Sequence, residues 1–131
     1  MIPETRPLSP HLQVYRWTYT LALSILHRIT GIGLAVGFVL LAWWLSALAT
    51  GPGAYDDFTA LAASRLGRAL LAVFAAAFWY HFCAGIRHLV FDTGRSLERR
   101  EARRSSVVVV AAAVLLALLS GAAIFSAGAN P

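Results

Sequence analysis

Histidines are rare inside apolar stretches long enough to cross a membrane, because an ionisable side chain there costs several kcal/mol unless it is paired or coordinated. In the apolar stretch 69–91 and directly after it, His81, Gly85, His88 and Asp92 recur at spacings that place them on one helical face. His81 lies eleven residues from Asp92, or about 16 Å along a helix, which is close to the bilayer midplane. A neutral imidazole at that depth suits axial ligation of a haem iron, and Gly85 leaves room for a flat macrocycle.

Other roles for His81 stay open at this point, namely a hydrogen bond across a helix interface and a step in a proton relay. A low-spin haem also needs a second axial ligand. His27 lies at a similar depth, about 12 Å from the inner end of its helix, so ligation by both histidines of this chain competes with ligation by a partner's histidine. Arg28, Arg87, His27 and His88 are the cations available for the haem propionates.

A second polar cluster lies near the start of the first apolar stretch, where Thr20, Ser24, His27, Arg28 and Gly31 form one stripe. The Ser24 hydroxyl and the Arg28 guanidinium can donate hydrogen bonds to a carbonyl or carboxylate near the membrane surface. The alternative is that Arg28 extends to the interface and Ser24 bonds its own backbone.

Composition places these residues in a membrane protein. Of 131 residues, 59% are hydrophobic and 13% are charged, which excludes an ordinary soluble enzyme, a disordered tail and a secreted disulfide scaffold. The single cysteine excludes an internal disulfide and a cysteine-ligated iron–sulfur site. The eleven basic residues are all arginines at the ends of apolar segments, with no exposed aromatic face for stacking bases, so no nucleic-acid partner is expected.

Three stretches reach the roughly 20 residues that a membrane-spanning helix needs. We therefore expect an all-α membrane protein of one domain, 1–131. The expected parts are an inner-side segment 1–18, transmembrane helices at about 19–49, 68–93 and 105–127, a short interfacial helix over 55–66, and a solvated connection over 95–104.

Loop charges predict the orientation, because arginine and lysine are retained on the cytoplasmic side. Arginines are concentrated in segments 1–18 and 95–104, whereas the arginines of the loop between the first two helices are offset in part by Asp56 and Asp57. The tail after the third helix carries no charged side chain. The N-terminus is therefore predicted inside and the C-terminus outside.

Three blocks of sequence resemble the cytochrome b membrane-anchor subunit of succinate dehydrogenase, respiratory complex II. They are RPLSPHLQVY at 6–15, the SxxHRxTG pattern at 24–31 and the HxxxGxRHLxxD pattern at 81–92. The blocks occur in the family's order and cover the first two helices, whereas the third helix matches only as an apolar span.

The resemblance implies that this chain packs with a second three-helix anchor subunit and that haem b lies between them, with one histidine ligand from each. His81 is the implied ligand from this chain, which disfavours ligation by His27. The implied quinone site uses Ser24 and Arg28, and the implied residues near the haem propionates are His27, Arg28 and His88.

The resemblance also implies the partners and the reaction. Succinate is oxidised on a flavoprotein subunit, electrons pass through an iron–sulfur subunit, and ubiquinone or a related quinone is reduced beside this chain, which has no dicarboxylate site of its own. The alternatives are the anchor of a fumarate reductase and a non-redox proton-path or assembly subunit, which would be colourless. Because no transit peptide is seen, a bacterial cytoplasmic membrane is expected rather than a mitochondrial inner membrane.

Overall fold

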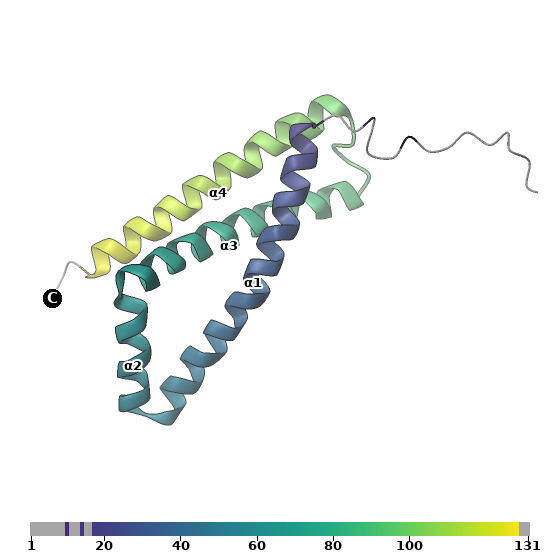
Figure 1. Cartoon of the computed structure of the whole chain (residues 1–131). Coiled ribbons are helices and arrows are strands. Elements are labelled where there is room, and N and C mark those ends of the chain that lie inside the picture. The colour runs from purple at the N-terminus through teal and green to yellow at the C-terminus, as the bar shows by residue number, and fades with distance from the viewer. Residues whose placement is uncertain (1–9, 11–13, 15–16, 129–131) are drawn as a thin grey trace, which may run out of the picture.

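The structure is a computed structural model that describes residues 10, 14 and 17–128, with side chains up to residue 122. The expected inner-side segment 1–18 therefore lies almost entirely outside the described residues. The elements are α1 (Tyr19–Thr50), α2 (Pro52–Ala63), α3 (Arg65–Asp92) and α4 (Arg99–Gly128) (Figure 1). Helices α3 and α4 run side by side, and α1 crosses α3. Helix α2 connects the C-terminal end of α1 to the N-terminal end of α3.

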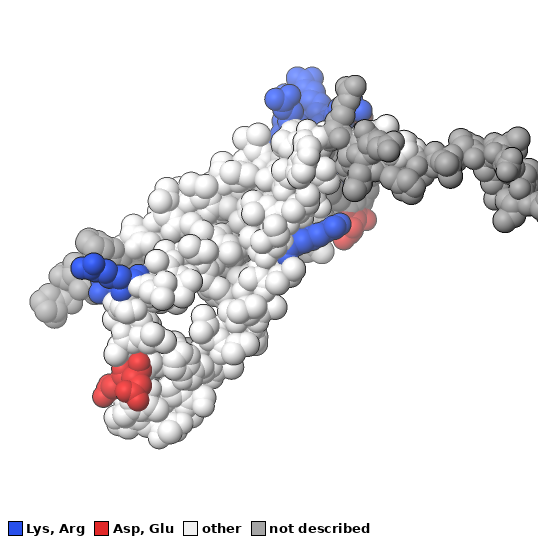
Figure 2. Space-filling view, in the orientation of Figure 1, with Lys and Arg blue, Asp and Glu red and all other residues white. Residues whose placement is uncertain are grey.

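Three of these helices are long and apolar enough to cross a membrane, which confirms the predicted all-α fold with three spans. Helix α1 has 32 residues and is therefore about 48 Å long, well beyond the roughly 30 Å of a bilayer core. Figure 2 shows charged side chains gathered toward the two ends of the molecule, with an uncharged band between them. This distribution is the one that a hydrocarbon layer requires.

The helix boundaries near the first connection differ from the expected ones. Helix α2 begins at Pro52 instead of near 55, because a proline fits the first turn of a helix, where its missing N–H costs nothing. Helix α3 begins at Arg65 instead of 68, because the Ser64 hydroxyl accepts a hydrogen bond from the Gly67 backbone N–H at 3.0 Å. An N-cap of this kind starts the helix before the apolar run does.

Helix α4 begins at Arg99 instead of near 105, so the second half of the expected solvated connection over 95–104 is a mostly exposed part of the helix. Arginine and glutamate are good helix formers, so charge in this segment does not interrupt the helix. The segment is also tied to α3, since the Arg87 guanidinium donates to the Ala102 carbonyl at 3.1 Å. The charge pattern therefore indicates where the apolar part of the third span starts, but α4 itself starts several residues earlier, within the charged segment.

The contact between α3 and α4 consists mostly of small side chains packed around Tyr80. The buried cluster consists of Tyr80, Cys83 and Ala84 from α3 with Val109 and Ala113 from α4. Small residues let two membrane helices approach closely enough for dispersion contacts, which drive helix association where water is absent. The contact is extended by the Trp79 indole N–H, which donates to the Ser120 hydroxyl at 2.9 Å.

Helix α1 contacts α3 at several points along the crossing. The Tyr80 hydroxyl donates to the Leu23 carbonyl at 2.7 Å, which links the two helices by a hydrogen bond. Further along, the Phe74 ring lies against the backbone of Gly37, which is buried. A Cβ atom at Gly37 would overlap that ring.

Large apolar side chains cover most of the remaining surface. Phe38, Val39 and Leu118 are each at least two-thirds exposed, and many other leucines, valines and isoleucines of the spans are exposed as well. In water this surface would be an aggregation liability, but in a bilayer it contacts lipid or other membrane helices at no cost. The chain alone thus buries only a small core.

Arg87 ties the end of α3 to the start of α4. Its Nε donates to the Ser105 hydroxyl at 3.0 Å and its terminal NH2 group donates to the Ala102 carbonyl at 3.1 Å. The guanidinium carbon also lies 4.4 Å from the centre of the Phe91 ring. Arg87 is therefore engaged within this chain, whereas the sequence suggested it as a cation for haem propionates.

We expect Gly37→Ala to destabilise the crossing of α1 and α3, because the added methyl group must displace the Phe74 ring. Overpacking of this kind costs about 1–3 kcal/mol, which lowers the midpoint of thermal unfolding of the detergent-purified protein. Gly33→Ala is the matched control, since a Cβ atom added at Gly33 would have nothing within 4 Å of it. Equal midpoints for the two variants would contradict the close contact.

We also expect Arg87→Met to lower the unfolding midpoint, since it removes two hydrogen bonds made by a charged donor. Bonds of this type contribute about 1.5–3 kcal/mol each. Arg87→Lys keeps the charge but lacks the planar fork, so its midpoint falls between those of the wild type and Arg87→Met. Arg95→Met serves as the control because Arg95 is exposed. If Arg95→Met lowers the unfolding midpoint as much as Arg87→Met does, the effect comes from the loss of a positive charge and not from the lost hydrogen bonds.

Candidate functional site

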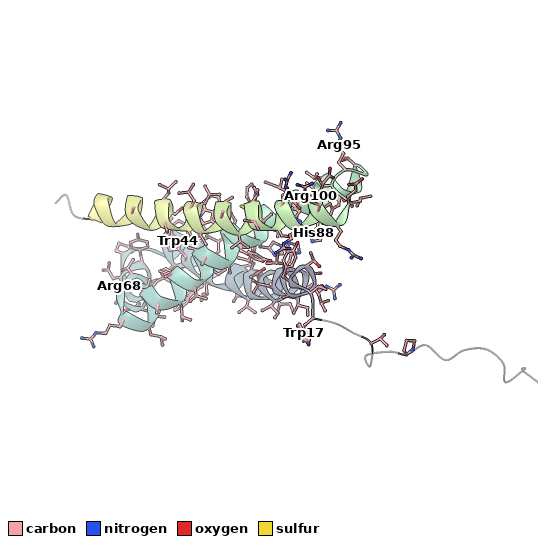
Figure 3. The ribbon with its side chains drawn as sticks, turned by 90° about the horizontal axis from the view of Figure 1, so that it is seen from above. Trp17, Trp44, Arg68, His88, Arg95 and Arg100 are labelled. Atoms are coloured by element: carbon pink, nitrogen blue, oxygen red, sulfur yellow. The ribbon has the colours of Figure 1, made fainter. Side chains whose placement is uncertain are left out.

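Three histidines from two helices meet near the N-terminal half of α1. The ring of His27 stacks on that of His81, with centroids 4.1 Å apart and planes 15° apart. The same His27 ring lies 4.9 Å from that of His88. His81 and His88 are seven residues apart on α3, about 10 Å along its axis, so His27 fills the space between them. In Figure 3, His88 lies between the start of α4 and the first part of α1.

The His81 ring is anchored by its Nδ1 atom. Nδ1 lies 3.1 Å from the backbone carbonyl oxygen of His27 and 3.2 Å from the Thr30 hydroxyl. A carbonyl oxygen can only accept, so Nδ1 carries the proton and donates it. In the neutral ring the lone pair then belongs to Nε2, because the bond made by one ring nitrogen determines the state of the other. The arrangement is the one usually found for a metal-ligating histidine.

The stacked geometry excludes ligation of one iron by His27 and His81 together. Axial ligands approach the iron from opposite faces of the macrocycle, so their rings point at each other end-on with the metal between them. The rings of His27 and His81 lie face to face at 4.1 Å instead. The two histidines do lie at a similar depth, as the sequence indicated, but their rings are not placed to ligate one iron together.

The environment of the cluster leaves one buried polar atom unpaired. His27 Nε2 is buried and has no hydrogen-bond partner among the described residues. An unpaired polar atom in a membrane interior is costly. A group from a cofactor or another chain would remove that cost. Beside the cluster, nothing lies within 4 Å of a Cβ built on Gly85, so the space next to α3 is open there.

Ser24 and Arg28 lie on α1, one helical turn apart. Ser24 is half-buried and Arg28 is exposed. Because Arg28 directly follows His27, its side chain leaves the helix about 100° around the axis from the His27 ring. The structure thus brings His27, His81 and His88 into contact, and it places the two expected quinone-binding residues on an adjoining side of the same helix.

Sequence reasoning assigned no role to Thr30, although it belongs to the SxxHRxTG pattern. Thr30 is 9% exposed, and its hydroxyl lies within hydrogen-bond distance of His81 Nδ1. A signal was present in the sequence, because Thr30 follows His27 by three residues and therefore shares its face of the helix.

A metal ion held by this chain alone is not supported within the described residues. No group of three or more His, Cys, Asp or Glu side chains is arranged there to hold one. One histidine with a free Nε2 instead fits a metal whose other ligands come from a macrocycle and a second chain.

The chain is similar in sequence to known proteins of one family. Residues 3–120 match the family described as Succinate dehydrogenase/Fumarate reductase transmembrane subunit. The succinate dehydrogenase cytochrome b556 subunit of Paracoccus denitrificans is 48% identical over 99 residues, 76% of each chain. The mitochondrial succinate dehydrogenase cytochrome b560 subunit of Homo sapiens is 44% identical over 102 residues, 74% of this chain and 59% of that protein.

A third relative, the succinate dehydrogenase cytochrome b556 subunit of Rickettsia felis, is 39% identical over 94 residues, which cover 71% of this chain and 72% of that protein. The family match reaches into all three spans, beyond the motifs of the first two helices. With three membrane-spanning helices, a histidine cluster on two of them and relatives of this similarity, the chain belongs to the succinate dehydrogenase/fumarate reductase transmembrane subunit family.

Proposed function

We propose that this chain is the cytochrome b membrane anchor of a succinate dehydrogenase. In this proposal it binds haem b together with a second three-helix anchor subunit, forms part of the quinone-reduction site, and attaches the iron–sulfur and flavoprotein subunits to the membrane. The whole chain acts as one anchor domain and has no dicarboxylate site of its own. The names of the relatives favour succinate oxidation over fumarate reduction.

One observation carries the haem assignment. His81 donates its Nδ1 proton to the His27 carbonyl, at 3.1 Å, which leaves the Nε2 lone pair for a metal. His81 is therefore the axial ligand from this chain, and the partner anchor subunit supplies the other.

The residues around His81 fit a haem b. When bound, the haem supplies one-electron chemistry, with a potential set by its axial ligands and surroundings. The open space at Gly85 leaves room for the macrocycle beside α3. The unpaired Nε2 of His27, with Arg28 and His88, provides hydrogen-bond donors and positive charge for the propionates.

The quinone is the substrate of the site at Ser24 and Arg28. Both residues lie in the first third of α1, and the exposed Arg28 can reach a ligand outside this chain. The Ser24 hydroxyl and the Arg28 guanidinium donate hydrogen bonds to a quinone oxygen and stabilise the negative charge that develops there on reduction. Such donors are most effective in a pocket from which water is excluded.

The chain belongs in a bacterial cytoplasmic membrane with its N-terminus inside. The arginines that follow α3 and begin α4 support this orientation, because short arginine-rich loops are retained on the cytoplasmic side. The Ser24 and Arg28 site then lies on the inner side, where the soluble subunits deliver electrons. The exposed apolar faces of the three spans supply the surface for the second anchor subunit and for lipid.

We expect His81→Ala to abolish the b-type bands in the dithionite-reduced minus oxidised spectrum of the purified complex. His27→Ala keeps them, because the backbone carbonyl that orients His81 is not removed by the substitution. If His27→Ala loses the bands and His81→Ala keeps them, then His27 and not His81 is the haem ligand. A wild-type complex without these bands would refute haem binding and favour a proton-path or assembly subunit.

We expect Arg28→Leu to reduce succinate:quinone reductase activity by roughly 100-fold, the usual loss when one donor to a developing oxyanion is removed. Ser24→Ala loses about tenfold, since it removes one neutral hydrogen bond. Reduction of a soluble dye by succinate stays at the wild-type rate in both variants, because that reaction needs only the soluble subunits. Arg65→Leu, at the opposite end of the molecule, is the control. Full quinone reductase activity in Arg28→Leu would refute the site.

A further inference from the structure

We propose that Thr30 and Gly31 are positioning residues for His81: they fix the orientation of its ring and thereby tune the redox potential of the iron that it ligates. This inference rests on the proposed function, because it takes His81 as a haem ligand. Both residues belong to the SxxHRxTG pattern, and neither has a role in the functions assigned above.

Thr30 supplies a second acceptor for the proton of His81. Its hydroxyl lies 2.9 Å from the Leu26 carbonyl and 2.9 Å from the His27 carbonyl, and it donates its single proton to these acceptors of its own helix. Its lone pairs then accept from His81 Nδ1, which lies 3.2 Å away. The Nδ1 proton is thus shared between the Thr30 hydroxyl and the His27 carbonyl. Because both acceptors lie on one turn of α1, they hold the His81 ring in one orientation.

Gly31 supplies the space in which the ring lies. A Cβ atom built on Gly31 would be 2.9 Å from Cε1 of His81 and 3.5 Å from its Nδ1. The ring cannot yield to a side chain there without lengthening its two Nδ1 hydrogen bonds. At Gly33, only two residues further along α1, an added Cβ atom would have nothing within 4 Å of it. The requirement for glycine at position 31 is therefore set by the His81 ring.

These contacts act on the iron through the imidazole. A proton held by two oxygen acceptors is drawn away from Nδ1, which makes the ring more electron-rich and Nε2 a stronger donor. An electron-rich axial ligand stabilises ferric iron more than ferrous iron, so it lowers the haem potential. Loss of the Thr30 hydroxyl weakens this effect and raises the potential.

The Thr30 contact is tested by comparing Thr30→Val with Thr30→Ser in the purified complex. Valine has the shape of threonine without the hydroxyl, whereas serine keeps the hydroxyl. A spectroscopic redox titration of the haem is expected to show a higher midpoint potential in Thr30→Val, with about a threefold rise in the ferrous-to-ferric ratio at the wild-type midpoint. Thr30→Ser keeps the wild-type potential.

The Gly31 contact is tested by comparing Gly31→Ala with Gly33→Ala. Gly31→Ala is expected to lower the haem content per complex by at least half, roughly the consequence of a disturbed ligand-supporting bond. The haem that remains has an altered low-spin ferric EPR spectrum, which depends on the orientation of the axial imidazoles. Gly33→Ala keeps the wild-type content and spectrum, because the same methyl group meets open space.

The outcomes separate this inference from the proposed function. If His81→Ala loses the haem but Thr30→Val has an unchanged or lower potential, the role of the Thr30 hydroxyl is refuted and ligation by His81 stands. Loss of haem in Thr30→Val with retention in Thr30→Ser supports the hydroxyl, whereas loss in both variants refutes it. If Gly31→Ala has the haem content and the EPR spectrum of the wild type, the role of the Gly31 contact is refuted. A wild-type complex without b-type haem refutes both proposals.

Discussion

His81 Nδ1 lies within hydrogen-bond distance of two oxygen atoms of α1, at 3.1 and 3.2 Å, and these contacts depend on a close crossing of α1 and α3. The His27 carbonyl and the Thr30 hydroxyl can reach Nδ1 only if α1 and α3 cross closely at this depth. The crossing needs a residue without a side chain at Gly31, and further along it needs another at Gly37. In a membrane interior, where water cannot replace a missing partner, a hydrogen bond of this kind ties the two helices together firmly.

The other polar groups inside the spans also need hydrogen-bond partners from the protein, because water is absent there. Arg87 is stabilised by bonds to the start of α4, and the Trp79 and Tyr80 donors each find an acceptor on a neighbouring helix. Among the described residues, His27 Nε2 is the one buried side-chain nitrogen or oxygen atom without a hydrogen-bond partner. Its position within the histidine cluster agrees with a site that is completed by a cofactor and a second chain. The exposed apolar surface of the spans agrees with the same conclusion.

Several features could be predicted from the sequence because they depend on local patterns. The three spans follow from apolar runs long enough for a bilayer, and the common depth of His27 and His81 follows from counting residues along two helices. The start of α4 was predicted too late, because arginines and glutamates end an apolar run without ending a helix. The start of α3 was also predicted too late, since its N-cap, Ser64, precedes the apolar residues.

The sequence by itself determined that three apolar helices carry histidines and arginines where such residues are expensive, because hydropathy and helical period are properties of each segment alone. Only the tertiary structure decided what these side chains contact. It turned Arg87 toward α4, stacked His27 on His81 face to face, and brought the Thr30 hydroxyl to a ring 51 residues away. The physical reason is that a hydrogen bond or a ring contact between helices depends on ångström-scale differences in crossing angle and helix rotation, and no single helix specifies these.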